Sequence, residues 1–161
     1  MPGGQERALR RRINSVQSTK QITRAMELIA ATRVVKAMTR ANAARPYSTK
    51  MTGVIEDLAA GGVGIDDPLL RSSETVSSIG FVVITSDRGL AGAYNSSVIR
   101  AAEKEIMAAQ TEGKEYKLVL VGKKAADYFR FRNYQIEASF SGMTDTPSYE
   151  DARVVATTVR D

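Results

Sequence analysis

The chain has 161 residues, 43% apolar and 25% charged, a balance typical of a soluble globular protein with one core. It contains no cysteine and no histidine, which excludes disulfides, thiolate metal sites, Ser-His triads and most zinc chemistry. No window approaches the roughly 20 apolar residues of a membrane span, and no apolar run near the N-terminus predicts a secretory signal.

The charges are distributed unevenly along the chain, whose net charge is +5. Residues 1–50 hold eleven Lys and Arg residues but only two acidic ones, whereas residues 51–161 hold twelve basic and sixteen acidic residues. The two parts are therefore predicted to face different partners.

Residues 1–60 are predicted to form one long basic helix, beginning near Gly4 and ending at Gly61-Gly62. Pro46 is expected to kink this helix without ending it. The apolar residues that step mostly by three or four are Leu9, Ile13, Val16, Ile22, Met26, Ile29, Val34, Met38, Met51, Val54, Ile55 and Leu58. This spacing, together with plentiful alanine, is typical of a two-stranded coiled coil.

The length of this helix requires a partner. At about 1.5 Å per residue, some 55 residues span roughly 80 Å. A compact domain of the remaining ~100 residues has a radius of gyration of only about 13 Å, and an isolated helix needs tertiary contacts in water. A second long helix or a surrounding complex is therefore expected to cover it.

The cations of the helix fall nearly all round it, at about 100° per residue. They are Arg7, Arg10, Arg11, Arg12, Lys20, Arg24, Arg33, Lys36, Arg40, Arg45 and Lys50. A basic coiled coil that binds nucleic acid is one alternative, but a duplex would favour cations on one face. No aromatic residue precedes Tyr47, which also argues against stacking on single strands.

Residues 61–78 read as a connector with an Asp-Asp-Pro turn, and residues 79–161 as an α/β domain with a mostly parallel sheet. The domain is expected to be Rossmann-like and incomplete at its C-terminus, because the sequence ends inside a helical pattern. The predicted strands are Ile79–Thr85, Lys117–Val121 and Tyr134–Ala138, and the predicted helices are Tyr94–Thr111, Lys123–Arg130 and Ser148–Val159.

The loop after the first strand, Ser86–Gly92, is the main candidate site. A phosphate could bind at the following helix N-terminus, so a small phosphate-handling enzyme using Asp87 and Arg88 is a second alternative. The loop lacks both dinucleotide and P-loop signatures, and Gly89 and Gly92 are better explained by turn geometry and close packing. The adjacent pairs Asp66-Asp67 and Glu150-Asp151 read as turn and cap residues. No metal or cofactor is expected.

Two motifs make the chain resemble the gamma subunit of the F-type rotary ATP synthase. Arg12–Val16 and Gln21–Arg33 are similar to the family's N-terminal helix, and Ala44-Arg45-Pro46-Tyr47 matches a further part of it. Thr85–Asn95 is similar to the family's S-D-R-G-L-C-G-x-x-N signature, with Ala91 where Cys is frequent. The resemblance covers essentially the whole chain, but the family's long C-terminal helix is missing.

The resemblance implies a non-catalytic rotor shaft that couples proton flow to ATP synthesis or hydrolysis at the beta subunits. The first helix would be half of an antiparallel coiled coil inside the alpha–beta ring, and the α/β domain would lie against the epsilon subunit and the c-ring. The complex would be peripheral on the cytoplasmic face of a bacterial membrane. Arg24, Met26, Arg33 and Lys36 would face beta, and Asp87, Arg88, Gly89, Gly92 and Asn95 would form an interface or structural loop.

Overall fold

The structure, a computed structural model, describes residues 2–61 and 75–160. The chain divides into two units, residues 1–66 and 67–161. Most of the connector predicted at residues 61–78, including its Asp-Asp-Pro turn, lies outside the described residues.

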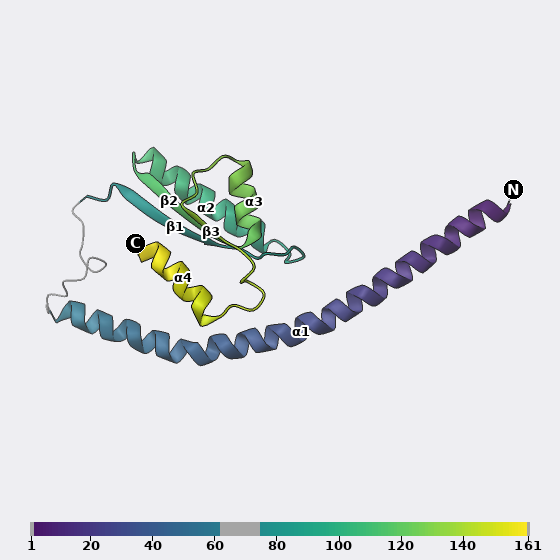
Figure 1. Ribbon diagram of the computed structural model, residues 1–161, viewed down its shortest axis with the longest axis horizontal. Coiled ribbons are helices and arrows are strands. Elements are labelled where there is room, and N and C mark those ends of the chain that lie inside the picture. The colour runs from purple at the N-terminus through teal and green to yellow at the C-terminus, as the bar shows by residue number, and fades with distance from the viewer. Residues whose placement is uncertain (1, 62–74, 161) are drawn as a thin grey trace. The chain divides into compact units, whose positions relative to one another are not determined.

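The first unit is one helix, α1 (Pro2–Ala60), of 59 residues. At about 1.5 Å per residue it is roughly 90 Å long. Figure 1 shows it as a gently curved helix without a break, so Pro46 does not interrupt it. Ala43, Ala44 and Arg45, which directly precede Pro46, are good helix formers and help to sustain the helix where Pro46 lacks an N–H group.

Within its own unit, α1 buries none of its large apolar side chains. Leu9, Ile22 and Met26, for example, are 61%, 60% and 46% exposed. Side chains of α1 form local interactions with one another, such as the ion pair between Arg10 and Glu6 at 2.8 Å. Among residues 2–61 and 75–160, no helix combines the length and hydropathy that crossing a membrane requires.

We therefore expect α1 to be only marginally stable in the isolated 161-residue chain. An unaccompanied helix gains little from burial, and its apolar residues contribute only when a partner covers them. Hydrogen exchange of a monomeric sample should show amides 10–45 exchanging close to the rates of an unfolded chain, while core amides of β2 stay protected. Strong protection throughout 10–45 in a monomer would contradict this expectation.

The second unit is an α/β unit with a parallel three-stranded sheet in the order β1-β2-β3. Its elements are β1 (Ser78–Ile84), α2 (Tyr94–Thr111), β2 (Glu115–Val121), α3 (Lys123–Phe131), β3 (Ala138–Phe140) and α4 (Tyr149–Arg160). The α/β prediction is confirmed, and apart from β3 the predicted helix and strand ends agree to within two residues.

The core lies between the sheet and α2 and α3. Phe81 and Val83 of β1 alternate inward with Leu118 and Leu120 of β2. They pack against Ile99 and Ile106 of α2 and against Ala125, Ala126 and Phe129 of α3. Leu118, Leu120, Ile106 and Phe129 are fully buried, which makes this layer the hydrophobic centre of the unit.

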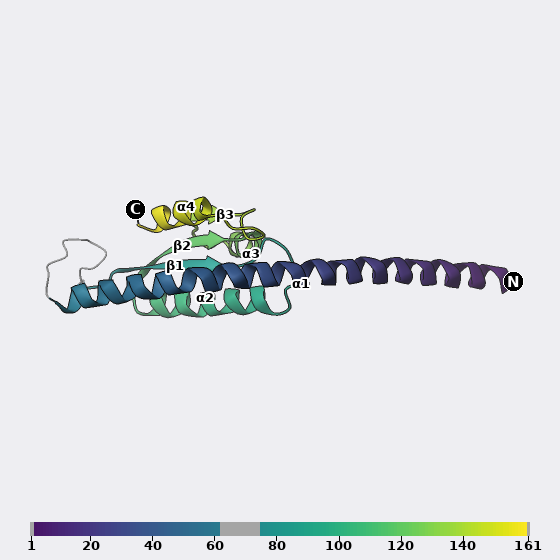
Figure 2. The same ribbon diagram turned by 90° about the horizontal axis from the view of Figure 1, so that it is seen from below.

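The other face of the sheet carries α4. Ile84 of β1 and Val121 of β2 lie opposite one another in register and share a hollow with Val155 and Ala156 of α4. Figure 2 shows α2 on one side of the strands and α4 on the other. The unit is thus three-layered, with the carboxyl ends of the strands, and the loop after β1, at one end of the sheet.

The predicted third strand is present, but its predicted bounds, Tyr134–Ala138, are wrong, because the ladder with β2 runs from Ala138 to Phe140. After α3 the chain turns at Asn133, whose φ is 57°, and the Tyr134 N–H donates to the Phe129 carbonyl at 3.0 Å. Tyr134 and Ile136 then pack against the core before the ladder begins. Their alternation therefore reflects core packing and imitates a strand pattern.

Candidate functional site

The candidate site is the loop between β1 and α2, which begins at the buried end of β1. The Thr85 side chain is 2% exposed, and its hydroxyl oxygen accepts from the Ala125 N–H at 2.9 Å, near the start of α3. The same hydroxyl lies 3.3 Å from the Val121 carbonyl oxygen, to which it donates. Thr85 thus ties the end of β1 to β2 and to α3.

Gly122, between β2 and α3, lies directly against this residue. Its φ is +98°, and a Cβ there would lie 2.1 Å from the Thr85 carbonyl oxygen. Only glycine fits both the backbone angle and the space. Sequence reasoning missed Thr85 and Gly122 as supporting residues, and the one signal was a glycine directly after a buried apolar run.

Asp87 joins three segments through its carboxylate. Its Oδ1 accepts from the Lys123 N–H at 3.0 Å, at the start of α3. Its Oδ2 accepts from the Gly142 N–H at 3.0 Å, the Thr144 N–H at 3.1 Å and the Thr144 hydroxyl at 2.6 Å. The loop after β1, the start of α3 and the loop after β3 are therefore held by one side chain.

These bonds stabilise the ionised carboxylate. The Thr144 hydroxyl has the largest effect, and with the N–H groups of Gly142, Thr144 and Lys123 it lowers the pKa of Asp87 from 3.8 to about 2, although burial opposes the shift. A carboxylate that accepts several hydrogen bonds is a poor proton acceptor near neutral pH. Asp87 is therefore positioned as a structural clamp.

The loop is also anchored where it meets α2, through hydrogen bonds between Asn95 and Ser86. Asn95 accepts from the Ser86 N–H at 2.9 Å and its amide nitrogen donates to the Ser86 hydroxyl at 2.8 Å. Arg88 forms an ion pair with Asp145 at 2.9 Å, in which the arginine side chain is 77% exposed. Asp87, Arg88 and Asn95 are thus brought together, each fixing one part of the loop.

The two loop glycines serve turn geometry at most. Gly92 has a φ of +56°, but a Cβ at Gly89 or Gly92 would meet no atom within 4 Å. The expectation of close packing is wrong for both, because this part of the loop is open to solvent. Between them, Leu90 combines a φ of 62° with a side chain that is 93% exposed.

The loop offers little to a phosphate or to an acid–base reaction. Its one cation, Arg88, is engaged by Asp145, and no side chain caps α2 at Ala93. Of the predicted carboxylate pairs, Asp66-Asp67 lies outside the described residues. Asp151 accepts from Ser148 at the start of α4, and Glu150 forms an ion pair with Arg153.

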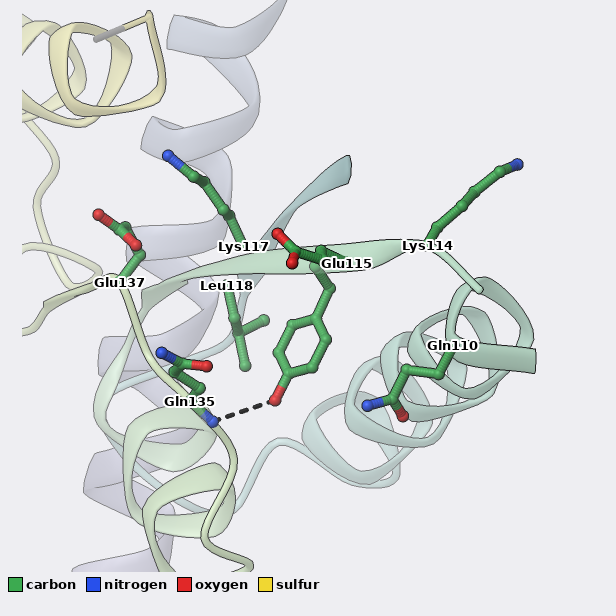
Figure 3. Close-up of a pocket in the computed structure, with 8 residues that line it drawn as sticks. Gln110, Lys114, Glu115, Lys117, Leu118, Gln135 and Glu137 are labelled. Atoms are coloured by element: carbon green, nitrogen blue, oxygen red, sulfur yellow. Dashed lines mark hydrogen bonds between the residues drawn. The ribbon is translucent and has the colours of Figure 1, made fainter. Parts of the chain in front are cut away.

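A polar hollow of about 460 Å³ lies at the opposite end of the sheet, near the start of β2. Gln110, Glu115, Leu118 and Glu137 help to line it, and the Gln135 N–H donates to the Tyr116 hydroxyl at 3.1 Å. Figure 3 shows Lys114 and Lys117 extending away from one another, so the charges do not converge on one point. In the described parts of the chain, no group of three acidic side chains could hold a metal ion.

The residues predicted to face a partner on α1 lie on two sides of the helix. At about 100° per residue, Met26, Arg33 and Lys36 fall within one quarter of its circumference. Arg24 lies about 160° from Met26 and shares a shallow hollow with Lys20, Thr23 and Glu27. The structure thus brings three of the four together and separates Arg24 from them.

The fold and the loop define an α/β protein with a long basic helix that is exposed within its own unit and a loop held by a structural carboxylate. A family model described as ATP synthase matches residues 5–161. The ATP synthase gamma chain of Frankia casuarinae is 50% identical over 153 residues, which are 95% of this chain and 51% of that protein. The gamma chain of Kineococcus radiotolerans is 46% identical over 152 residues, 94% of this chain and 50% of that protein.

The chain belongs to the ATP synthase gamma-chain family. It spans about half the length of the curated relatives that it matches. A solved structure of the central stalk and c-ring of the Tetrahymena thermophila mitochondrial ATP synthase has a TM-score of 0.67 and 24% identity. That likeness covers 86% of this chain and 58% of the other, and it supports the fold.

Proposed function

We propose that this chain is part of the central rotor shaft of an ATP synthase, a non-catalytic subunit that couples proton flow to ATP synthesis or hydrolysis. The observation that carries the proposal is α1, 59 residues long, with exposed apolar side chains and cations on all sides. A helix that turns inside a sleeve needs contacts at many angles. Family membership supports the same function.

In this proposal α1 pairs with a second long helix as an antiparallel coiled coil within a ring of alpha and beta subunits. Contacts that differ between open and closed beta subunits would supply the coupling free energy. Met26, Arg33 and Lys36 face beta from one side of the shaft and Arg24 from the other. The complex is peripheral on the cytoplasmic face of a bacterial membrane.

The second unit, on this proposal, contacts the epsilon subunit and the c-ring. The loop from Asp87 to Asn95 supports an interface role, because it is anchored at both ends yet presents Leu90 almost fully to solvent. A rigid loop that exposes a large apolar side chain is suited to docking on another protein. The two alternatives, nucleic-acid binding and phosphate chemistry, have no supporting observation in the site.

Charge reversal on opposite sides of α1 tests whether a ring of subunits surrounds the helix. One pair is Arg33→Glu with Lys36→Glu, and the other, on the far side, is Lys20→Glu with Arg24→Glu. In an ATP synthase whose gamma chain carries this sequence over the matched region, we expect each pair to lower proton-driven ATP synthesis about fivefold or more. Two weakened charge contacts of about 0.5–1 kcal/mol each give that magnitude.

The control is the charge-conserving pair Arg33→Lys with Lys36→Arg, which should retain most of the rate. An effect from one side alone would show that α1 docks through a single face, contrary to a surrounding sleeve. Normal coupling in both reversed pairs would exclude the shaft role itself.

A further inference from the structure

Leu90, in the loop after β1, has the most exposed large apolar side chain in the described parts of the chain, at 93%. Almost none of its surface is covered within the second unit. A single exposed apolar residue is ordinary on a protein surface, so the exposure alone indicates no function. The backbone of the same residue supplies the second observation.

That backbone is left-handed, with a φ of 62° at Leu90. A bulky residue is disfavoured there, because its Cβ comes too close to the following carbonyl oxygen. Among the described residues, the other non-glycine residue with a positive φ is Asn133, and asparagine tolerates this region. Gly92 in the same loop also has a positive φ, but there the residue is a glycine. Leucine at position 90 is therefore unfavourable in the free unit in both its backbone and its side chain.

Hydrogen bonds on either side fix this backbone. Before the left-handed residue, the Ser86 hydroxyl donates to the Arg88 carbonyl, and the Asp87 carboxylate accepts four hydrogen bonds. After it, the Tyr94 N–H donates to the Ala91 carbonyl at 3.2 Å. Strained conformations persist where the surrounding structure over-determines them, and they are concentrated at binding sites. A side chain presented in this way loses little conformational freedom when a partner covers it.

The neighbours of Leu90 in the sequence leave its side chain standing alone. Gly89, Ala91, Gly92 and Ala93 carry no side chain larger than a methyl group. A partner can therefore surround the whole leucine side chain, while no second large apolar residue of the loop widens the contact. One projecting side chain fits a pocket better than a flat surface, and it offers too little apolar area to hold a protein on a membrane.

We propose that Leu90 is the anchor through which the second unit binds a neighbouring protein subunit, with its side chain in a leucine-sized apolar pocket of that subunit. The left-handed backbone is the strain that presents this side chain. The inference rests on the proposed function, in which this loop is an interface. It adds the residue that carries the affinity and the kind of surface that receives it. The stability of the free unit and the strength of the contact are therefore opposed at this position.

Leu90→Asn separates these two effects, because asparagine tolerates the left-handed angle but cannot fill an apolar pocket. In the 161-residue chain, the urea midpoint of the second unit should rise by about 0.5 M. In an ATP synthase whose gamma chain carries this sequence over the matched region, proton-driven ATP synthesis should fall at least about fivefold. A residue with a purely structural role would lower both measurements. Leu90→Met, which keeps an apolar side chain of similar volume, should recover most of the lost rate.

Asn133→Gly, at the other left-handed residue, is the matched control and should leave the rate of ATP synthesis unchanged. A photoreactive benzoylphenylalanine placed at position 90 identifies the receiving surface in the assembled complex. On illumination it should cross-link to one segment of one kind of subunit, and that segment should be rich in apolar residues.

The anchor role is excluded if Leu90→Asn leaves ATP synthesis unchanged while the charge reversals on α1 lower it. A fall in both the urea midpoint and the synthesis rate would also overturn it, since Leu90 would then act within its own unit. Cross-links to lipid, or to several kinds of subunit, would contradict a single protein pocket. If Leu90→Asn and the charge reversals all leave synthesis unchanged, the rotor function itself is wrong, and the anchor role with it.

Discussion

Gly122→Ala is expected to unfold the second unit or to leave it only marginally stable. The new Cβ would lie 2.1 Å from the Thr85 carbonyl oxygen, at a residue whose φ is +98°. The neighbouring atoms are the carbonyl group and the hydroxyl oxygen of buried Thr85, whose N–H group is bonded to β2, so they cannot move without disturbing the sheet. We expect a loss of at least about 3 kcal/mol, a large part of the stability of a small domain.

Gly113→Ala is the matched control for this variant. Gly113 also has a positive φ, +74°, but a Cβ there would meet no atom within 4 Å. The loss should be about 1–2 kcal/mol, the cost of the backbone angle alone. Urea unfolding of the second unit, followed by circular dichroism, measures the loss of unfolding free energy in both variants. Equal losses would show that the contact with Thr85 is not responsible for the effect of Gly122→Ala.

Asp87→Asn is expected to have the second largest effect. Asparagine retains one oxygen acceptor, but its amide group places donors against the N–H groups of Gly142 and Thr144. Because hydrogen bonds to a charged group contribute more than neutral ones, we expect a loss of about 2–3 kcal/mol. Asp145→Asn removes the exposed partner of Arg88 and should cost less than about 0.5 kcal/mol. Equal losses of unfolding free energy in Asp87→Asn and Asp145→Asn would contradict the role of Asp87 as a structural clamp.

The same carboxylate gives a pH dependence with a definite sign. The pKa of Asp87 is lowered to about 2 in the folded protein, against 3.8 ordinarily. The contribution of the Asp87 carboxylate to the stability of the folded protein is therefore complete above about pH 4 and is lost as the pH falls through 2. The difference in unfolding free energy between the parent chain and Asp87→Asn should shrink by about 1–2 kcal/mol over that range. Asp151, whose pKa is lowered by the Ser148 hydroxyl and N–H, titrates in both proteins and cancels in the comparison.

Local patterns in the sequence were sufficient for most of the elements. The helical spacing from Leu9 to Leu58 and the absence of proline between Pro2 and Pro46 predict α1, and the apolar run from Ile79 to Thr85 predicts β1. The loop that begins at Asp87 could be identified as the candidate site because it follows a buried strand and precedes a helix. Each of these signals depends on residues that are neighbours in the chain, which is where periodicity and turn chemistry act.

The roles of the loop residues depended on residues far away in the chain. The sequence alone leaves Asp87 open as a reactive carboxylate, but Lys123, Gly142 and Thr144, brought from 36 to 57 residues away, make it a structural clamp. Tyr134 and Ile136 imitate a strand because the core that they cover is built from other elements. That Gly122 tolerates no side chain follows only from the position of the Thr85 carbonyl. The sequence by itself therefore determined which segments are helices and strands, and the tertiary structure decided which groups meet, because those contacts join segments that no local pattern connects.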